Sequence, residues 1–166
     1  MARRVVKIER SWAPDPVYNS IAVTRFINNL MKDGKKIKAQ NIFYKAMKYI
    51  EEKTGKDAFT IFQTALKNVA PQVEVWPRRL GGATFLVPRV VRKERRFSKA
   101  VKLIIQAARQ RKGLPMYIKL AEELIAASNN EGDAYKAKLE MHKQAELNKA
   151  FAHLGWWNKK RPPQNK

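Results

Sequence analysis

The sequence predicts a mainly α-helical protein of six helices, with a two-stranded β-ribbon between the third and the fourth helix. Apolar residues recur at spacings of three and four in six segments, which is the period of amphipathic helices. Around Gly81-Gly82, two short runs of β-forming residues replace this period and predict a tight hairpin. With 166 residues, 45% of them hydrophobic, the chain is long enough to bury a core.

Three regions are expected along the chain. Residues 1–18 are predicted to be a basic extended arm, because they hold few apolar positions and two prolines that fix an extended course. Residues 19–155 are expected to form a single helical domain, with the ribbon at about 72–90. Residues 156–166 form a basic C-terminal tail.

The first helix is expected to begin after Ser20 as its N-cap and to end at Gly34. The second helix is predicted over about residues 37–53. Lys35 and Lys36 lie between the two helices. Their segment lacks the upstream glycine and the following Ser or Thr of a phosphate-binding loop, so it is interpreted as a basic corner.

The third helix and the ribbon have clear boundaries in the sequence. Gly55 closes the second helix, Asp57 is a strong N-cap for the third, and Pro71 stops it. Residues 73–76 and 84–87 then flank the glycine turn, and two prolines limit the backbone donors that can join the ladder. The ribbon is therefore expected to be short, and to lean on another surface because two strands alone are marginal in water.

Three helices are predicted after the ribbon. The fourth covers about residues 92–112 and the fifth about residues 115–128. The fifth is the least basic helix, because it carries Glu122 and Glu123, and it is expected to pack away from a polyanion. The last is predicted to run from Asp133, as its cap, to about Leu154.

The charge of the chain predicts a polyanionic partner. Lys and Arg exceed Asp and Glu by 35 to 14, and the sequence pI is about 10.4. Residues 76–113 hold twelve of these cations and one acid, Glu94, on both the ribbon and the fourth helix. So dense a field favours a phosphate polymer, and its spread over several elements suits an irregular folded RNA better than duplex DNA. Trp76 and Phe85 could stack on bases or pack the ribbon onto its own domain.

An enzyme is not predicted. The chain has no cysteine, its adjacent glutamates do not face one substrate, and His142 with Glu146 lacks the rest of a zinc motif. No cofactor, metal or small-molecule substrate is therefore expected. No apolar run approaches the ~20 residues of a membrane span, so no membrane partner is expected either.

Four segments of the chain carry a family resemblance. They are Asp15-Pro16, NLMKDGKKIKAQNIFYKAM (29–47), VEVWPRRLGGATFLVP (73–88) and NKAFAH (148–153). In this order, from about Asp15 to His153, they resemble the family of small-subunit ribosomal protein seven. The resemblance implies a helical bundle with a protruding ribbon, and a protein of the ribosome in a bacterial cytoplasm, a mitochondrion or a plastid. The alternative kept beside it is a free architectural or regulatory nucleic-acid-binding protein.

The resemblance also implies a function and a set of contacts. Members bind the 3′ major domain of small-subunit ribosomal RNA, nucleate assembly of the subunit's head, and are not enzymes. Their RNA contacts correspond by position to Arg3, Arg4, Lys7, Arg10, Lys35, Lys36, Arg78, Arg79, Arg92, Arg95 and Arg96, to which we add Lys99, Lys102 and Arg109. The resemblance places the exit-site transfer RNA and the messenger near Arg79, Leu80, Gly81, Gly82, Lys149 and His153, close to small-subunit protein eleven.

Overall fold

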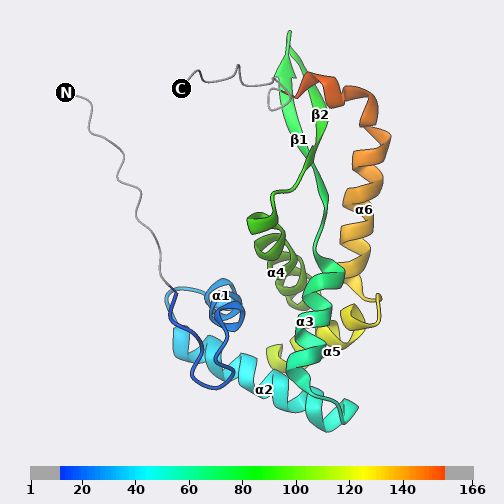
Figure 1. Cartoon of the computed structure of the whole chain (residues 1–166). Helices are drawn as coiled ribbons and strands as arrows, with labels where there is room; N and C mark the ends of the chain where they lie inside the picture. Colours follow the sequence, from blue (N-terminus) through cyan, green and yellow to red (C-terminus); the bar gives the residue numbers. More distant parts are fainter. Residues whose placement is uncertain (1–11, 156–166) are drawn as a thin grey trace, which may run out of the picture.

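The computed structural model describes residues 12–155, in which six α-helices, one 3-10 helix and two strands are found. In chain order these are α1 (Ile21–Leu30), α2 (Lys36–Thr54), α3 (Ala58–Val69), β1 (Val73–Leu80), β2 (Ala83–Val90), α4 (Lys93–Gln110), α5 (Met116–Ser128), α6 (Asp133–Leu147) and the 3-10 helix η1 (Lys149–Leu154). The predicted mainly α fold, with its ribbon between the third and fourth helices, is confirmed (Figure 1).

Three phenylalanines from successive helices form the centre of the core. Phe26, Phe43 and Phe62 come from α1, α2 and α3, and all three are fully buried. Their ring centroids lie 5.2–5.5 Å apart, two of the pairs edge to face, an arrangement that aromatic quadrupoles favour. Helix α5 packs against α2, α3, α4 and α6 and buries Leu120 and Leu124.

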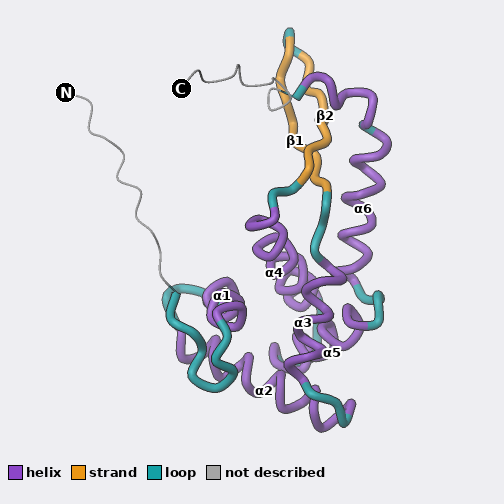
Figure 2. The backbone as a smooth tube through the Cα atoms, in the orientation of Figure 1, coloured by secondary structure: helices purple, strands orange, loops and turns teal. Residues whose placement is uncertain are grey.

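The ribbon projects beyond the helices (Figure 2). Its strands are eight residues each, longer than the four-residue runs predicted, and they pair from Val73↔Val90 to Leu80↔Ala83. Gly81 and Gly82 form the two-residue connection with φ of +54° and +88°. Positive φ at both positions is what a type I′ hairpin turn requires, so the predicted turn is confirmed.

The ribbon leans on the C-terminal part of the chain. Phe85 packs against Phe151 of η1 with ring centroids 5.3 Å apart, and α6 runs beside β1 (Figure 1). Of the two roles left open for Phe85, the structure therefore shows packing within the protein. On this side, α6 and η1 of the same chain therefore supply the supporting surface that was expected for the ribbon.

Helix ends were predicted with mixed success. Gly55 closes α2 in the left-handed conformation, and Asp57 caps α3 by accepting from the backbone N–H groups of Phe59 and Thr60, as predicted. The prediction that Gly34 ends the first helix was wrong, because α1 ends at Leu30. Arg109 stabilises this earlier end, since its guanidinium donates to the Leu30 carbonyl at 3.2 Å.

The last helix differs from its prediction at both ends. Asp133 does not cap it; the backbone N–H of Ala134 instead donates to the buried Glu123 carboxylate at 2.8 Å. Gly132 precedes the helix at φ +89°, and a Cβ there would approach Glu123 Oε1 to 2.9 Å. The helix stops at Leu147 rather than Leu154, because the Asn148 amide donates back to the Gln144 carbonyl and the chain tightens into η1.

Helix α6 is tied to the start of the ribbon by His142. Its Nε2 accepts from the backbone N–H of Gln72 at 3.1 Å, which requires an unprotonated nitrogen. Burial, followed by the charge of Lys138, lowers the pKa of His142 below its usual value. His142 was predicted to be a helix-surface residue rather than a metal ligand. In the structure it accepts a hydrogen bond that joins α6 to the ribbon.

A pH-dependent contribution to stability follows from His142. Because its pKa is lowered in the folded protein, the stabilising contact is complete above the unfolded pKa of about 6.5 and is lost as pH falls through the folded pKa. As the pH falls from about 7.5 to 5, the melting temperature of the wild type is therefore expected to drop further than that of His142→Gln. The glutamine keeps a hydrogen-bond acceptor that does not titrate. The matched control is His153→Gln at an exposed position, and its melting temperature should drop as far as that of the wild type. Equal losses in all three proteins would contradict this role.

Candidate nucleic-acid interface

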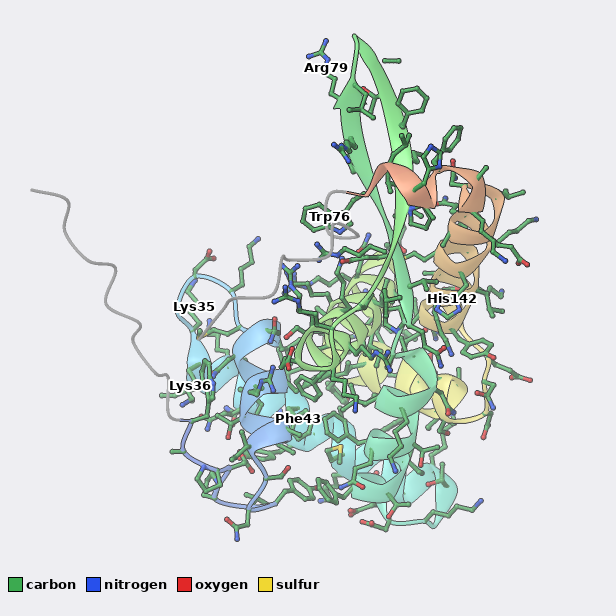
Figure 3. The ribbon with its side chains drawn as sticks, turned by 45° about the horizontal axis from the view of Figure 1, so that its top comes forward. Lys35, Lys36, Phe43, Trp76, Arg79 and His142 are labelled. Atoms are coloured by element: carbon green, nitrogen blue, oxygen red, sulfur yellow. The ribbon has the colours of Figure 1, made fainter. Side chains whose placement is uncertain are left out.

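The basic corner lies in the turn between α1 and α2. Asp33 and Gly34 hold positive φ of +53° and +72°, which reverses the chain and leaves Lys35 and Lys36 exposed at the start of α2 (Figure 3). Within residues 12–155, no carboxylate lies within ion-pairing distance of either ammonium group. Both charges are therefore available to an external anion.

The ribbon tip carries a second pair of cations. Arg78 and Arg79 are neighbours on β1, so their side chains leave opposite faces of the ribbon, cross-strand from Phe85 and Thr84. Arg79 is exposed near the free end of the ribbon (Figure 3). Arg78 is half-buried. No ion pair with an acid of the described part of the chain involves either residue. Arg79 is thus open to an anion on one side of the ribbon, whereas Arg78 shares the side on which Phe85 packs against η1.

The base of the ribbon is a buried ion-pair cluster around Glu74. This carboxylate is 3% exposed, lies 3.0 Å from Arg89 and lies 2.8 Å from Lys99 of α4. Burial alone would raise the pKa of Glu74, but hydrogen bonds from Lys99 and Trp76 and the two positive charges outweigh it and lower the pKa. Lys99, predicted as an RNA contact, therefore has an internal partner.

Trp76 also belongs to this cluster. The Arg89 guanidinium lies over its ring, 4.5 Å from the centroid, and the residue is still 37% exposed. Cation–π stacking inside the protein thus covers one side of the indole. Arg89 belongs to β2, so this contact lies within the ribbon, and neither stacking on a base nor packing of Trp76 onto the helical domain is decided by it.

The start of α4 gathers cations where a helix disfavours them. Arg92, Lys93 and Arg95 are exposed around its first turn, and Arg96 turns back to donate to the Val91 carbonyl at 3.2 Å. A helix N-terminus carries a partial positive charge, so cations crowded there repel it as well as one another. A bound phosphate would relieve both repulsions, since free N–H groups and guanidinium forks both match its oxygens.

A groove of about 510 Å³ runs between the end of α1 and the outer face of α4. Lys102 and Arg109 line it together with the amides of Asn29, Gln106 and Gln110. Both side chains are exposed. Arg109 also donates a hydrogen bond to the Leu30 carbonyl at the end of α1. The structure therefore brings these two predicted residues into one groove, which Ile105 also lines.

The residues expected near transfer RNA and messenger fall into two places. Leu80, Gly81 and Gly82 form the ribbon tip, whereas Lys149 and His153 are exposed on η1, which packs against β2. The two groups share one end of the molecule without sharing one site. The predicted contacts Arg3, Arg4, Lys7 and Arg10 lie outside the described residues.

Two important side chains were not predicted. Arg25 of α1 stacks on Phe97 of α4 at 4.6 Å and reaches Ser98, so it clamps the two helices that form the groove. Glu74 neutralises cations that the charge count assigned to RNA. A lone acid between Val73 and Val75 in a β-forming run was the available signal for Glu74. Arg25 offered none, because its partner is distant in sequence.

No group of three His, Cys, Asp or Glu side chains within residues 12–155 is placed to hold a metal ion. None of the described helices is long and apolar enough to cross a membrane. A helical bundle with exposed cations on a corner, a ribbon and a helix start defines a polyanion-binding protein.

Comparison with known proteins identifies the class more closely. The family model described as ribosomal protein S7p/S5e matches residues 2–149. Proteins named small ribosomal subunit protein uS7 from Thermotoga petrophila and Pseudothermotoga lettingae are 53% and 51% identical to the chain, each over 94% of it and over their own full length. The uS7 protein of Caldanaerobacter subterraneus is 51% identical over the same share. The chain belongs to the ribosomal protein S7 family of the small ribosomal subunit. It is a structural ribosomal protein and not an enzyme, and ribosomal RNA and other ribosomal proteins are its partners.

Proposed function

We propose that the chain binds the 3′ major domain of small-subunit ribosomal RNA and nucleates assembly of the subunit's head. The observation that carries this proposal is the spread of exposed cations without acidic partners over the corner, the ribbon tip and the start of α4. The proposed contacts are Arg3, Arg4, Lys7, Arg10, Lys35, Lys36, Arg78, Arg79, Arg92, Arg95, Arg96, Lys102 and Arg109, with Lys99 in a secondary role because Glu74 holds it.

Three separate cationic elements suit a folded RNA. Side chains on a helix corner, a helix start and a ribbon present charge in different directions, as phosphates of several RNA helices would require. A single straight groove would instead favour a duplex. The arm of residues 1–18 and the tail of residues 156–166 are proposed to extend this surface, on either side of a single helical domain of residues 19–155.

We further propose that the end of the molecule with the ribbon tip and η1 lies near the exit-site transfer RNA and the messenger, beside small-subunit protein eleven. Arg79 and the backbone of Leu80, Gly81 and Gly82 would face the nucleic acids, because glycine lets a backbone approach closely. Lys149 and His153 are exposed on the adjacent η1. Support comes from the projection of this end beyond the bundle (Figure 2).

Removing the ribbon cations tests the proposal. The double variant Arg78→Ala, Arg79→Ala is expected to bind a transcript of the 3′ major domain roughly ten- to a hundredfold more weakly near 0.1 M salt. The slope of log affinity against log salt should become shallower by about 1.5, because two phosphate contacts are lost. Filter binding across a salt series measures both quantities.

The matched control is Lys45→Ala with Lys48→Ala. These exposed lysines of α2 remove the same charge from a surface not assigned to RNA. The control should bind within about threefold of wild type if only local contacts matter. Equal losses in the two double variants would show that net charge, and not the ribbon, governs binding.

A further inference from the structure

A cavity of about 220 Å³ lies beside the basic corner, between the loop of residues 12–16 and the first two helices. Thr24 and Asn28 line it from α1, and Lys36 and Gln40 line it from α2. Each pair is spaced by four residues, so each helix presents one continuous face to the cavity. Trp12 of the loop forms a further wall and is 40% exposed.

The walls are held in place before any ligand arrives. The Asp15 carboxylate is 3% exposed and accepts from the backbone N–H groups of Val17 and Tyr18, both at 3.2 Å, and from the Tyr44 hydroxyl at 2.7 Å. Thr24 donates its hydroxyl proton to the Ala13 carbonyl at 2.9 Å. The loop is therefore fixed to both helices, and the cavity has a defined shape.

The polar groups that remain free in the cavity are neutral amides. Within residues 12–155, neither the Asn28 nor the Gln40 side chain makes a hydrogen bond of its own. Each amide offers a donor and an acceptor in one plane, the pattern that matches the edge of a nucleobase. The indole of Trp12 offers a flat surface for stacking, and Lys36 offers one charge at the helix start.

We propose that this cavity holds a single unstacked base of the RNA, stacked on Trp12 and bonded along its edge by Asn28 and Gln40. The inference rests on the RNA binding proposed above. A bare phosphate fits the site less well, because the charge of Lys36 is offset by that of Asp15, which also lines the cavity. A volume below the ~300 to 1,000 Å³ of drug-sized pockets suits one planar ring system. Lys36 would then meet the phosphate attached to that base.

Salt dependence separates a base pocket from a phosphate contact. Trp12→Ala is expected to weaken binding of the 3′ major domain transcript about 5- to 100-fold, with an unchanged salt slope, because no charge is removed. Trp12→Phe should stay within about threefold of wild type, since a phenyl ring still stacks. Asn28→Ala with Gln40→Ala should weaken binding about 5- to 100-fold, again without altering the slope. Lys36→Ala is the contrasting variant and should make the slope shallower.

Each outcome bears on the proposal. If the wild-type chain fails to bind the transcript, the proposed function fails, and the pocket with it. If wild type binds and both the Trp12→Ala and the double amide variants bind equally well, the pocket proposal alone is overturned. The same holds if those variants only lower the melting temperature, since the cavity would then serve the packing of the loop or the arm. Ultraviolet cross-linking of a base to the peptide containing Trp12 would support the proposal directly.

Discussion

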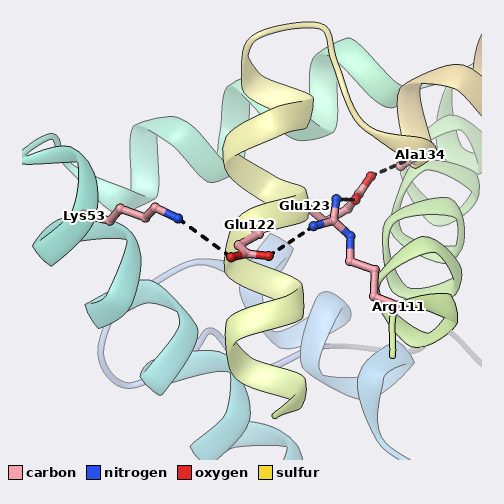
Figure 4. A network of polar contacts seen from close by, with 5 residues as sticks. All are labelled: Lys53, Arg111, Glu122, Glu123 and Ala134. Atoms are coloured by element: carbon pink, nitrogen blue, oxygen red, sulfur yellow. Dashed lines mark hydrogen bonds and ion pairs between the residues drawn. The ribbon is translucent and has the colours of Figure 1, made fainter. Parts of the chain in front are cut away.

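Replacing Glu123 by alanine is expected to lower the free energy of unfolding by about 2 to 4 kcal/mol. This carboxylate is fully buried, and its two oxygens hold different elements (Figure 4). Oε2 pairs with Arg111 beyond the end of α4, and Oε1 accepts from the Ala134 N–H in the first turn of α6. Truncation leaves the Ala134 donor without its acceptor in the interior and Arg111 with a weaker partner.

The neighbouring Glu122 provides the matched control. It makes ion pairs with Arg111 at 3.2 Å and Lys53 at 3.8 Å, but its side chain is 29% exposed (Figure 4). Surface pairs of this kind contribute about 0 to 1 kcal/mol, so Glu122→Ala should be mild. Urea denaturation of both variants, without RNA, measures the difference. Similar losses for the two glutamates would contradict the structural role assigned to Glu123.

Phe62→Ala is expected to cost about 3 to 5 kcal/mol of stability. Phe62 is fully buried, and its ring contacts Phe26 at 5.2 Å and Phe43 at 5.5 Å, so truncation opens a cavity where α1, α2 and α3 meet. The surrounding rings cannot close that space, because each is held by the others.

Phe59 is the appropriate comparison for Phe62. It lies on the same helix, is only half-buried, and stacks on Tyr18 at 5.6 Å. Phe59→Ala should therefore lose about half as much stability, because solvent and side chains can fill part of the gap. Thermal and urea unfolding of the two variants give the comparison. If Phe62→Ala lost less stability than Phe59→Ala, the ring cluster would not be the centre of the core.

Local signals in the sequence predicted the elements of this fold well. Helical spacing and the caps at Gly55 and Asp57 act within a few residues, and so does the glycine pair of the hairpin. The end of α1 was predicted wrongly because it depends on Arg109, a residue 79 positions away. The start of α6 depends in the same way on Glu123 of the preceding helix.

The candidate interface was harder to predict than the fold. Counting cations over residues 76–113 treated all of them as available, whereas Arg89 and Lys99 pair with Glu74 and Arg111 pairs with the two glutamates. Composition reports how much charge a segment carries, but only tertiary contacts show how much of it is already neutralised. Conversely, the cavity at Trp12 joins three segments whose individual residues looked ordinary in the sequence.

The Glu74 cluster has a consequence for how the ribbon meets its partner. Two strands alone would swing about their base and would lose that freedom when they bind. Here the ion pair between Glu74 and Lys99 of α4 fixes the root, and Phe151 packs against the flank. The direction of the ribbon is thus decided when the chain folds. If the ribbon binds RNA as proposed, association should order little beyond the tip, and the entropy lost on binding should stay small.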